Sequence, residues 1–168
     1  DPRWVGNERG KIDYENWNVI DRHGYLRWRP IEADTPLHKL HWFWHPNDTA
    51  SLKSVGELVD DYEDTVGRGG QGMLGVAPDD RGLLPDADVA RLKELGAALR
   101  ARYSDNLLHG HAAADANIAA ALDGDDATFW SAPAGAASSV LEVRMPHPIT
   151  FDSAMTMEWL NDGQAIQR

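Results

Sequence analysis

Two tryptophans, Trp42 and Trp44, flank Phe43 in a segment that we expect to form a strand over residues 41–45. Successive side chains of a strand point to opposite faces, so both indoles would share one face and Phe43 would lie on the other, in a core. Flat aromatic rings of this kind can stack on the apolar face of a sugar. Rings of this kind are compatible with a carbohydrate contact, and core packing is the alternative.

Three histidines, His38, His41 and His45, surround the same segment. Imidazole is a common metal ligand. The segment lacks a carboxylate spacing such as His-Glu-x-x-His, which would support a metal site. We therefore expect histidines that form hydrogen bonds or pack in a core, and no metal.

A second group of candidate functional residues lies far along the chain: the carboxylates of Asp123, Asp125 and Asp126, which precede Phe129-Trp130. Clustered carboxylates suit Ca²⁺. Asp123 and Asp125 are therefore candidate ligands of a structural calcium ion, and an acidic surface turn is an equally good interpretation. No other cofactor is expected.

The elements that must position these side chains alternate between strand and helix. We expect a short strand at Arg3–Val5, a helix over 51–67 with a capping box formed by Ser54 and Glu57, and a short apolar strand over 73–77. A second helix is predicted over 86–103, with Asp86 as its cap. This order is typical of α/β folds with a parallel sheet.

The pattern changes after Tyr103. Residues 110–139 are rich in Ala, Gly and Asp, and alternation of apolar and polar residues then appears over 140–145 and 149–159. Such alternation is expected for antiparallel strands with one buried face. We place a boundary near 104–108, which divides the chain into domains 1–104 and 105–168.

The bulk composition excludes several classes of partner. The net charge of −11 argues against nucleic acid, which is bound by clustered Lys and Arg. No apolar run approaches the roughly 18 residues of a membrane helix. The absence of cysteine excludes disulfides and thiol chemistry within this sequence. Both ends have the character of cuts within a longer chain.

Five blocks carry a resemblance to a known family. They are the run RWVGNERG at 3–10, PIEAD at 30–34, WFWHP at 42–46, residues 54–70 ending in VGRGG, and VAPDDRGL at 76–83. In this order the blocks resemble the α-L-fucosidases of the retaining glycoside-hydrolase type. Residues 122–130 are similar to the opening of a discoidin-like β-sandwich that often follows that barrel.

The resemblance implies a fold and a set of roles. The fold would be the last part of a (β/α)8-type barrel, followed by the start of an antiparallel sandwich. Glu8 would be the general acid/base of the branch that cleaves α1,3/4-linked fucose, with Glu32 and Glu15 as fallbacks. The residue-level alternative is a loop Glu8 paired with Arg3 or Arg9. An aromatic ring of the Trp42–Trp44 block would contact the sugar.

The family's nucleophile is an Asp in a Trp-Phe-Asp-Gly-like motif, which this sequence lacks. The resemblance therefore implies a fragment of a secreted or periplasmic exo-α-L-fucosidase that is inactive alone. Its partners would be fucosylated oligosaccharides or glycoconjugates and the remainder of its own catalytic domain. The alternatives are a non-catalytic carbohydrate-binding module and a degenerate homologue.

Overall fold

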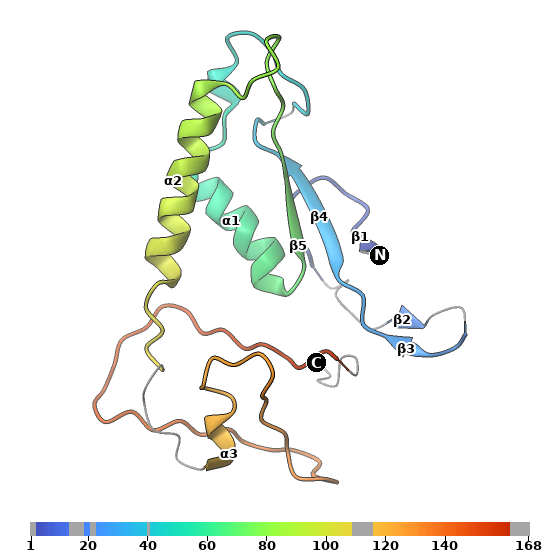
Figure 1. The fold of residues 1–168 in the computed structure, drawn as a ribbon, viewed down its shortest axis with the longest axis vertical. Helices are drawn as coiled ribbons and strands as arrows, with labels where there is room; N and C mark the ends of the chain where they lie inside the picture. The colour runs from blue at the N-terminus through green and yellow to red at the C-terminus, as the bar shows by residue number, and fades with distance from the viewer. Residues whose placement is uncertain (1–2, 14–18, 21–22, 40, 109–115, 162–168) are drawn as a thin grey trace. The chain divides into compact units, whose positions relative to one another are not determined.

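Figure 1 shows a computed structural model of the chain, which describes residues 3–13, 19–20, 23–39, 41–108 and 116–161. The chain divides into two compact units. The first comprises Asp1–Tyr103 and Met157–Arg168, and the second comprises Ser104–Thr156. Each unit has its own architecture.

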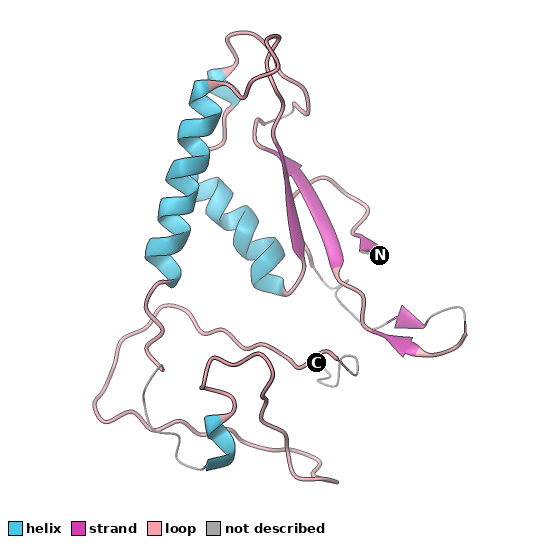
Figure 2. Ribbon diagram, viewed as in Figure 1, coloured by secondary structure: helices cyan, strands magenta, loops and turns pink. Residues whose placement is uncertain are grey.

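The first unit is built on a parallel sheet. Its three strands lie in the order β1 (Arg3–Trp4), β4 (Ile31–Pro36) and β5 (Gln71–Gly75). Both pairings are parallel, with Arg3 opposite Ile31 and Pro36 opposite Gly75. The predicted parallel α/β arrangement is therefore confirmed for this unit. A small antiparallel hairpin joins β2 (Val19–Ile20) and β3 (Leu26–Arg27) between β1 and β4 along the chain (Figure 2).

The central strand β4 has two different faces. Ile31, Ala33 and Thr35 are buried, whereas Glu32 and Asp34 are only half-buried. Ile31 and Ala33 form a small core with Ile12, against which Val5 packs. This strand was missed at the sequence level, although the alternation of Ile31, Ala33 and Thr35 has the period of a strand.

Two helices cover one side of the sheet, α1 against β5 and α2 against α1 (Figure 1). Helix α1 (Val55–Thr65) begins with the predicted capping box: Ser54 Oγ accepts the Glu57 N–H, and the Glu57 carboxylate accepts the Ser54 N–H. It is shorter than predicted because the 3₁₀ turns η1 (Thr49–Ser51) and η2 (Val66–Arg68) occupy its flanks.

Helix α2 (Asp86–Tyr103) has the predicted length. Asp86 is its first helical residue and not its cap, because the carbonyl of Pro85 accepts the Val89 N–H of the first turn. The two helices are joined near their ends, where the Tyr103 hydroxyl donates to Glu63 Oε1 at 3.0 Å. No helix in the described ranges is long and apolar enough to cross a bilayer.

The strand predicted over 41–45 was wrong. His41 forms only an isolated bridge with His38, so the chain folds back on itself, and Pro46 follows without an N–H to extend a ladder. The prediction that Phe43 belongs to a core was also wrong, since 81% of its surface is exposed. Trp42 and Trp44 therefore lie in a loop.

Over residues 104–108 and 116–156, which the structure describes, the second unit contains one short helix, α3 (Ala116–Ala119). The strands predicted over 140–145 and 149–159 are not formed in the described residues, and Val140 and Met155 are 84% and 82% exposed. Alternation specifies which side chains share a face, but a strand also needs a hydrogen-bonded partner. The structure therefore does not show the expected sandwich.

Candidate active site

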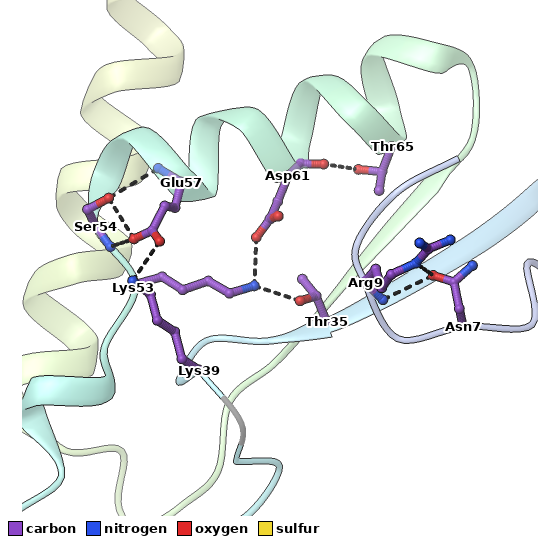
Figure 3. Close-up of polar contacts among 9 residues, drawn as sticks. All are labelled: Asn7, Arg9, Thr35, Lys39, Lys53, Ser54, Glu57, Asp61 and Thr65. Atoms are coloured by element: carbon purple, nitrogen blue, oxygen red, sulfur yellow. Dashed lines mark hydrogen bonds and ion pairs between the residues drawn. The ribbon is translucent and has the colours of Figure 1, made fainter. Parts of the chain in front are cut away.

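Glu8 lies in the loop that follows β1, and hydrogen bonds of its neighbours fix the backbone of this loop. Asn7 Oδ1 accepts hydrogen bonds from the backbone N–H of Arg9 at 3.1 Å and from its Nε at 3.3 Å (Figure 3). Glu8 lies between these two residues in the sequence, within the turn that they close. Gly10 N–H donates to the carbonyl of Asp34 on β4 at 3.0 Å. The loop is thus tied to the central strand two residues after Glu8.

Gly10 allows this close approach. It has a φ of +64°, in the left-handed region that favours glycine. A Cβ at this position would be 2.8 Å from Thr35 Cγ2, which is far inside van der Waals contact. Any larger residue would therefore push the Glu8 loop away from β4.

The structure brings Glu8 and Trp42 together, although they are 34 residues apart. The Trp42 indole N–H donates to Glu8 Oε2 at 2.7 Å. The benzo ring of the same indole lies against Gly75, the last residue of β5: a Cβ there would be 2.5 Å from Cζ3 and 2.7 Å from Cε3. Because parallel strands end on the same side of a sheet, Glu8, Trp42 and Gly75 meet at the carboxyl ends of β1, β4 and β5. We call these three residues the Glu8 site.

A second indole contact lies on the face of the sheet opposite α1. Trp4 Nε1 donates to Asp34 Oδ1 at 2.8 Å. Trp4 pairs with Glu32 in the register of the sheet, so Trp4, Glu32 and Asp34 share this face. Trp4 and Asp34 were not predicted as site residues. The alternation of Glu32 and Asp34 with buried neighbours was the signal that could have identified this acidic face.

Trp44 and the histidines line a small pocket that shares Gly75 with the Glu8 site. Its lining also includes His38, His45 and Asp88. His38 lies between two partners, with Nδ1 2.8 Å from Ser51 Oγ and Nε2 2.9 Å from Asp88 Oδ1. The expectation of hydrogen-bonded histidines is thus confirmed for His38. In the described part of the chain, no group of three or more metal-ligating side chains is arranged to hold an ion.

On the helix side of β4, a buried cation supports the sheet. Lys53 Nζ donates to Thr35 Oγ1 at 2.6 Å and to Asp61 Oδ2 at 2.8 Å (Figure 3). The Lys53 and Asp61 side chains are only 12% and 24% exposed. Burial raises the pKa of the Asp61 carboxyl, and the Lys53 ammonium opposes that rise. We call Lys53, Thr35 and Asp61 the Lys53 network.

The remaining predicted residues have the following places. Glu32 lies within β4, and Glu15 lies outside the described residues. Asp123 is held in a turn: its carboxylate accepts the Asp125 N–H at 2.9 Å and the Thr128 hydroxyl at 2.7 Å. These hydrogen bonds, the one from Asp125 first, lower the pKa of the Asp123 carboxyl. A calcium ion on Asp123 and Asp125 stays a prediction.

Comparison with known proteins gives consistent matches. Residues 1–103 match the family model of the α-L-fucosidases. The chain is 30% identical over 124 residues to Alpha-L-fucosidase 1 of Arabidopsis thaliana, covering 64% of this chain and 24% of that protein. It is 29% identical over 123 residues to an Oryza sativa protein named for the same activity, covering 63% and 23%.

Solved structures give the same result. A candidate α-L-fucosidase from Bacteroides thetaiotaomicron superposes with a TM-score of 0.68 at 28% identity, over 81% of this chain and 35% of that one. A GH29 fucosidase from Ruminococcus gnavus, solved in complex with fucose, superposes with a TM-score of 0.62 at 24% identity, over 77% and 31%, which is a likeness of fold. The chain spans about a quarter of the length of the two plant relatives, namely 24% of the Arabidopsis protein and 23% of the Oryza protein.

Proposed function

Since this chain belongs to the α-L-fucosidase family of glycoside hydrolases, we propose that it forms the C-terminal part of the catalytic barrel of a retaining exo-α-L-fucosidase. The proposed substrate is terminal α-linked L-fucose, in α1,3 or α1,4 linkage, on an oligosaccharide or glycoconjugate. The match to fucosidases, one of them solved with fucose, supports this substrate class. Residues 105–168 would begin the β-sandwich, and the enzyme would be secreted or periplasmic.

The observation that carries the proposal is the position of Glu8. Its carboxyl group is exposed at the carboxyl end of a parallel sheet, where barrel enzymes place their chemistry. Oε2 accepts the Trp42 N–H, and among the residues that the structure describes Oε1 accepts no hydrogen bond. The second oxygen is therefore available to a substrate.

In a retaining mechanism this carboxyl group acts twice. It first protonates the glycosidic oxygen as the bond to the sugar breaks and a carboxylate nucleophile attacks the anomeric carbon. It then takes a proton from the water that hydrolyses the glycosyl-enzyme. The nucleophile would be supplied by the remainder of the catalytic domain, about 5–5.5 Å from the acid/base in such enzymes. No metal or organic cofactor is part of this proposal.

The test is Glu8→Gln in the complete enzyme that contains this chain. We expect kcat/KM for a natural fucosylated oligosaccharide to fall by about 10²–10⁴-fold, the usual contribution of a positioned acid/base. An aryl α-L-fucoside with a good leaving group needs little proton donation and should lose much less. Glu32→Gln is the matched control, and the same selective loss in that variant would move the role from Glu8 to Glu32.

Unchanged hydrolysis of natural oligosaccharides by Glu8→Gln would remove Glu8 from the role. Sugar binding without any turnover by the complete protein would favour the carbohydrate-binding module, and neither binding nor turnover would favour a degenerate homologue. The 168-residue chain alone should not hydrolyse an aryl fucoside, because it lacks the family's nucleophile motif.

A further inference from the structure

We propose that Trp42 is a positioning residue for the acid/base, and that the Trp42 indole ring is held in place by its packing against Gly75. This inference rests on the proposed function of Glu8. It assigns Trp42 a role in orienting a carboxyl group and delivering its proton, which is different from stacking on a sugar.

The first argument is the hydrogen bond itself. The distance of 2.7 Å from the Trp42 Nε1 to Glu8 Oε2 is at the short end for N–H···O bonds. Glu8 is exposed, so its flexible side chain would otherwise sample many rotamers. One directed donor on a stiff ring restricts that freedom at the point where an acid must be aimed at an oxygen atom.

The second argument is the fit of the ring against β5. Gly75 is paired with Pro36 in the sheet, and its carbonyl accepts the Leu37 N–H at 2.9 Å, so its backbone is fixed relative to the end of β4. The Trp42 ring lies so close that a Cβ on Gly75 would overlap two of its carbon atoms. An indole is rigid and cannot bend away as the tip of a lysine can. The backbone of Gly75 therefore sets the position of the ring, and the ring sets the position of the N–H.

The arrangement also distinguishes the two oxygens of Glu8. Because Oε2 accepts the indole N–H, the carboxylic proton belongs on Oε1. During bond cleavage the proton passes from Oε1 to the glycosidic oxygen. In the second half of the reaction Oε1 receives a proton from water, and the indole N–H stabilises the carboxylate that exists between these two steps.

A sugar-stacking role makes a different prediction. Every fucoside presents the same fucose ring, so loss of a stacking surface should lower activity on all fucosides alike. Loss of a group that orients the acid should matter most where the leaving group needs a proton. The ratio of activities on a natural oligosaccharide and on an activated aryl fucoside separates the two roles.

The experiment measures that ratio for three variants of the complete enzyme. Trp42→Phe keeps an aromatic ring and removes the N–H. We expect kcat/KM for the natural substrate to fall by about 10–100-fold, the range of one hydrogen bond to a charged group, and that for the aryl substrate by less than about threefold. Gly75→Ala should show the same selectivity because it displaces the ring. Gly56→Ala, where a Cβ meets only Ser54 Oγ at 4.0 Å, is the control and should keep the wild-type ratio.

Two double variants complete the test. Adding Gly75→Ala to Trp42→Phe should cost less than the product of the single effects, since both remove the same contact. In a Glu8→Gln background, Trp42→Phe should no longer change the ratio. Circular dichroism of each variant establishes that the fold is retained.

Equal losses on both substrates for Trp42→Phe would overturn the proposal in favour of a sugar contact. No loss on either substrate would overturn it as well, because the indole N–H would then have no effect on catalysis. A wild-type ratio for Gly75→Ala would remove Gly75 from it. If Glu8→Gln itself shows no selectivity for the leaving group, the proposed function fails independently of any Trp42 variant, and the positioning role fails with it.

Discussion

The Glu8 site and the Lys53 network each contain one carboxyl group, and Gly10 connects them, because it follows Glu8 in the loop after β1 and lies against Thr35. Glu8 is exposed and its oxygen accepts a neutral indole N–H. Asp61 is mostly buried and accepts from an ammonium group, and a Cβ on Gly10 would be 3.3 Å from its other oxygen. One carboxyl group is accessible to a ligand, and the other forms an ion pair with Lys53, which also donates to Thr35 of β4.

The surroundings of the two carboxyl groups suit Glu8 to a role in reactivity and Asp61 to a role in stability. Burial raises the pKa of Asp61, so its native form binds a proton more tightly than the unfolded chain does. The contribution of this group to the free energy of unfolding therefore falls as the pH rises from the ordinary pKa of an Asp to the raised one. The Lys53 ammonium stabilises the ionised form of Asp61 against the cost of its burial. The comparison predicts that changes in the network affect stability while leaving the preference between leaving groups unchanged.

The largest effect on stability is expected for Lys53→Met. It removes the cation but keeps the packing of the aliphatic stem, and it leaves Asp61 mostly buried without its partner. We expect a loss of about 2–3 kcal/mol in the free energy of unfolding, measured with urea. Lys93→Met on the exposed part of α2 is the control and should cost under about 0.5 kcal/mol. An equal cost for both variants would contradict the role of the network.

Gly10→Ala tests the position where the two regions meet. The left-handed backbone and the contact with Thr35 should together cost about 1–3 kcal/mol of stability. This variant should also shift the Glu8 loop and lower activity on natural substrates selectively. Gly24→Ala has a similar φ of +82° but open space around its Cβ, so it isolates the backbone cost. A wild-type activity ratio in Gly10→Ala would show that Glu8 does not depend on this close approach.

Ser54→Ala should cost about 1 kcal/mol, because it removes the hydroxyl that accepts the Glu57 N–H at the start of α1. Urea unfolding measures this loss. Ser54→Asp restores an acceptor at the cap and should recover most of it. Neither variant should change the ratio of activities on the natural and the aryl substrate. A change would show that the start of α1 affects the Glu8 site.

The smallest effect concerns pH. The Lys39 ammonium, followed by Ser54, lowers the pKa of Glu57 from 4.5 to about 2. The native state thus releases this proton more readily than the unfolded chain, so the contribution of Glu57 is complete above pH 4.5 and is lost as the pH falls through about 2. Glu57→Gln keeps an acceptor for the cap but cannot titrate. The difference in Tm between wild type and Glu57→Gln should therefore shrink as the pH is lowered across this window, and a constant difference would contradict the assignment.

Much of the first unit was predictable because its signals are local. The apolar spacing of the two helices and the Ser54–Glu57 pair specify α1 and α2 without reference to the rest of the chain. The strand β4 was missed because Glu32 and Asp34 interrupt its apolar residues and Pro36 ends it. Its identity depends on two neighbouring strands that are distant in sequence.

The same distinction holds for the site. Glu8 and Trp42 were chosen by resemblance, and the structure places them in contact. The donor role of the indole and the fit of Gly75 could not be predicted, because they depend on the register of β5 against β4. The expectation that Trp42 and Trp44 share one face of a strand was wrong for another reason: alternation was applied to a segment that the bridge between His38 and His41 turns into a loop. Their contact with a sugar stays a prediction.

The order β1–β4–β5 has a consequence for handling this chain. Among the described residues, β5 has one flank without a strand beside it, so the backbone N–H and C=O groups on that flank can pair with an extended peptide. A closed barrel has no such flanks, because every strand has two neighbours. Produced on its own, the chain should therefore self-associate through strand pairing, and short peptides that mimic the missing neighbours should suppress that association.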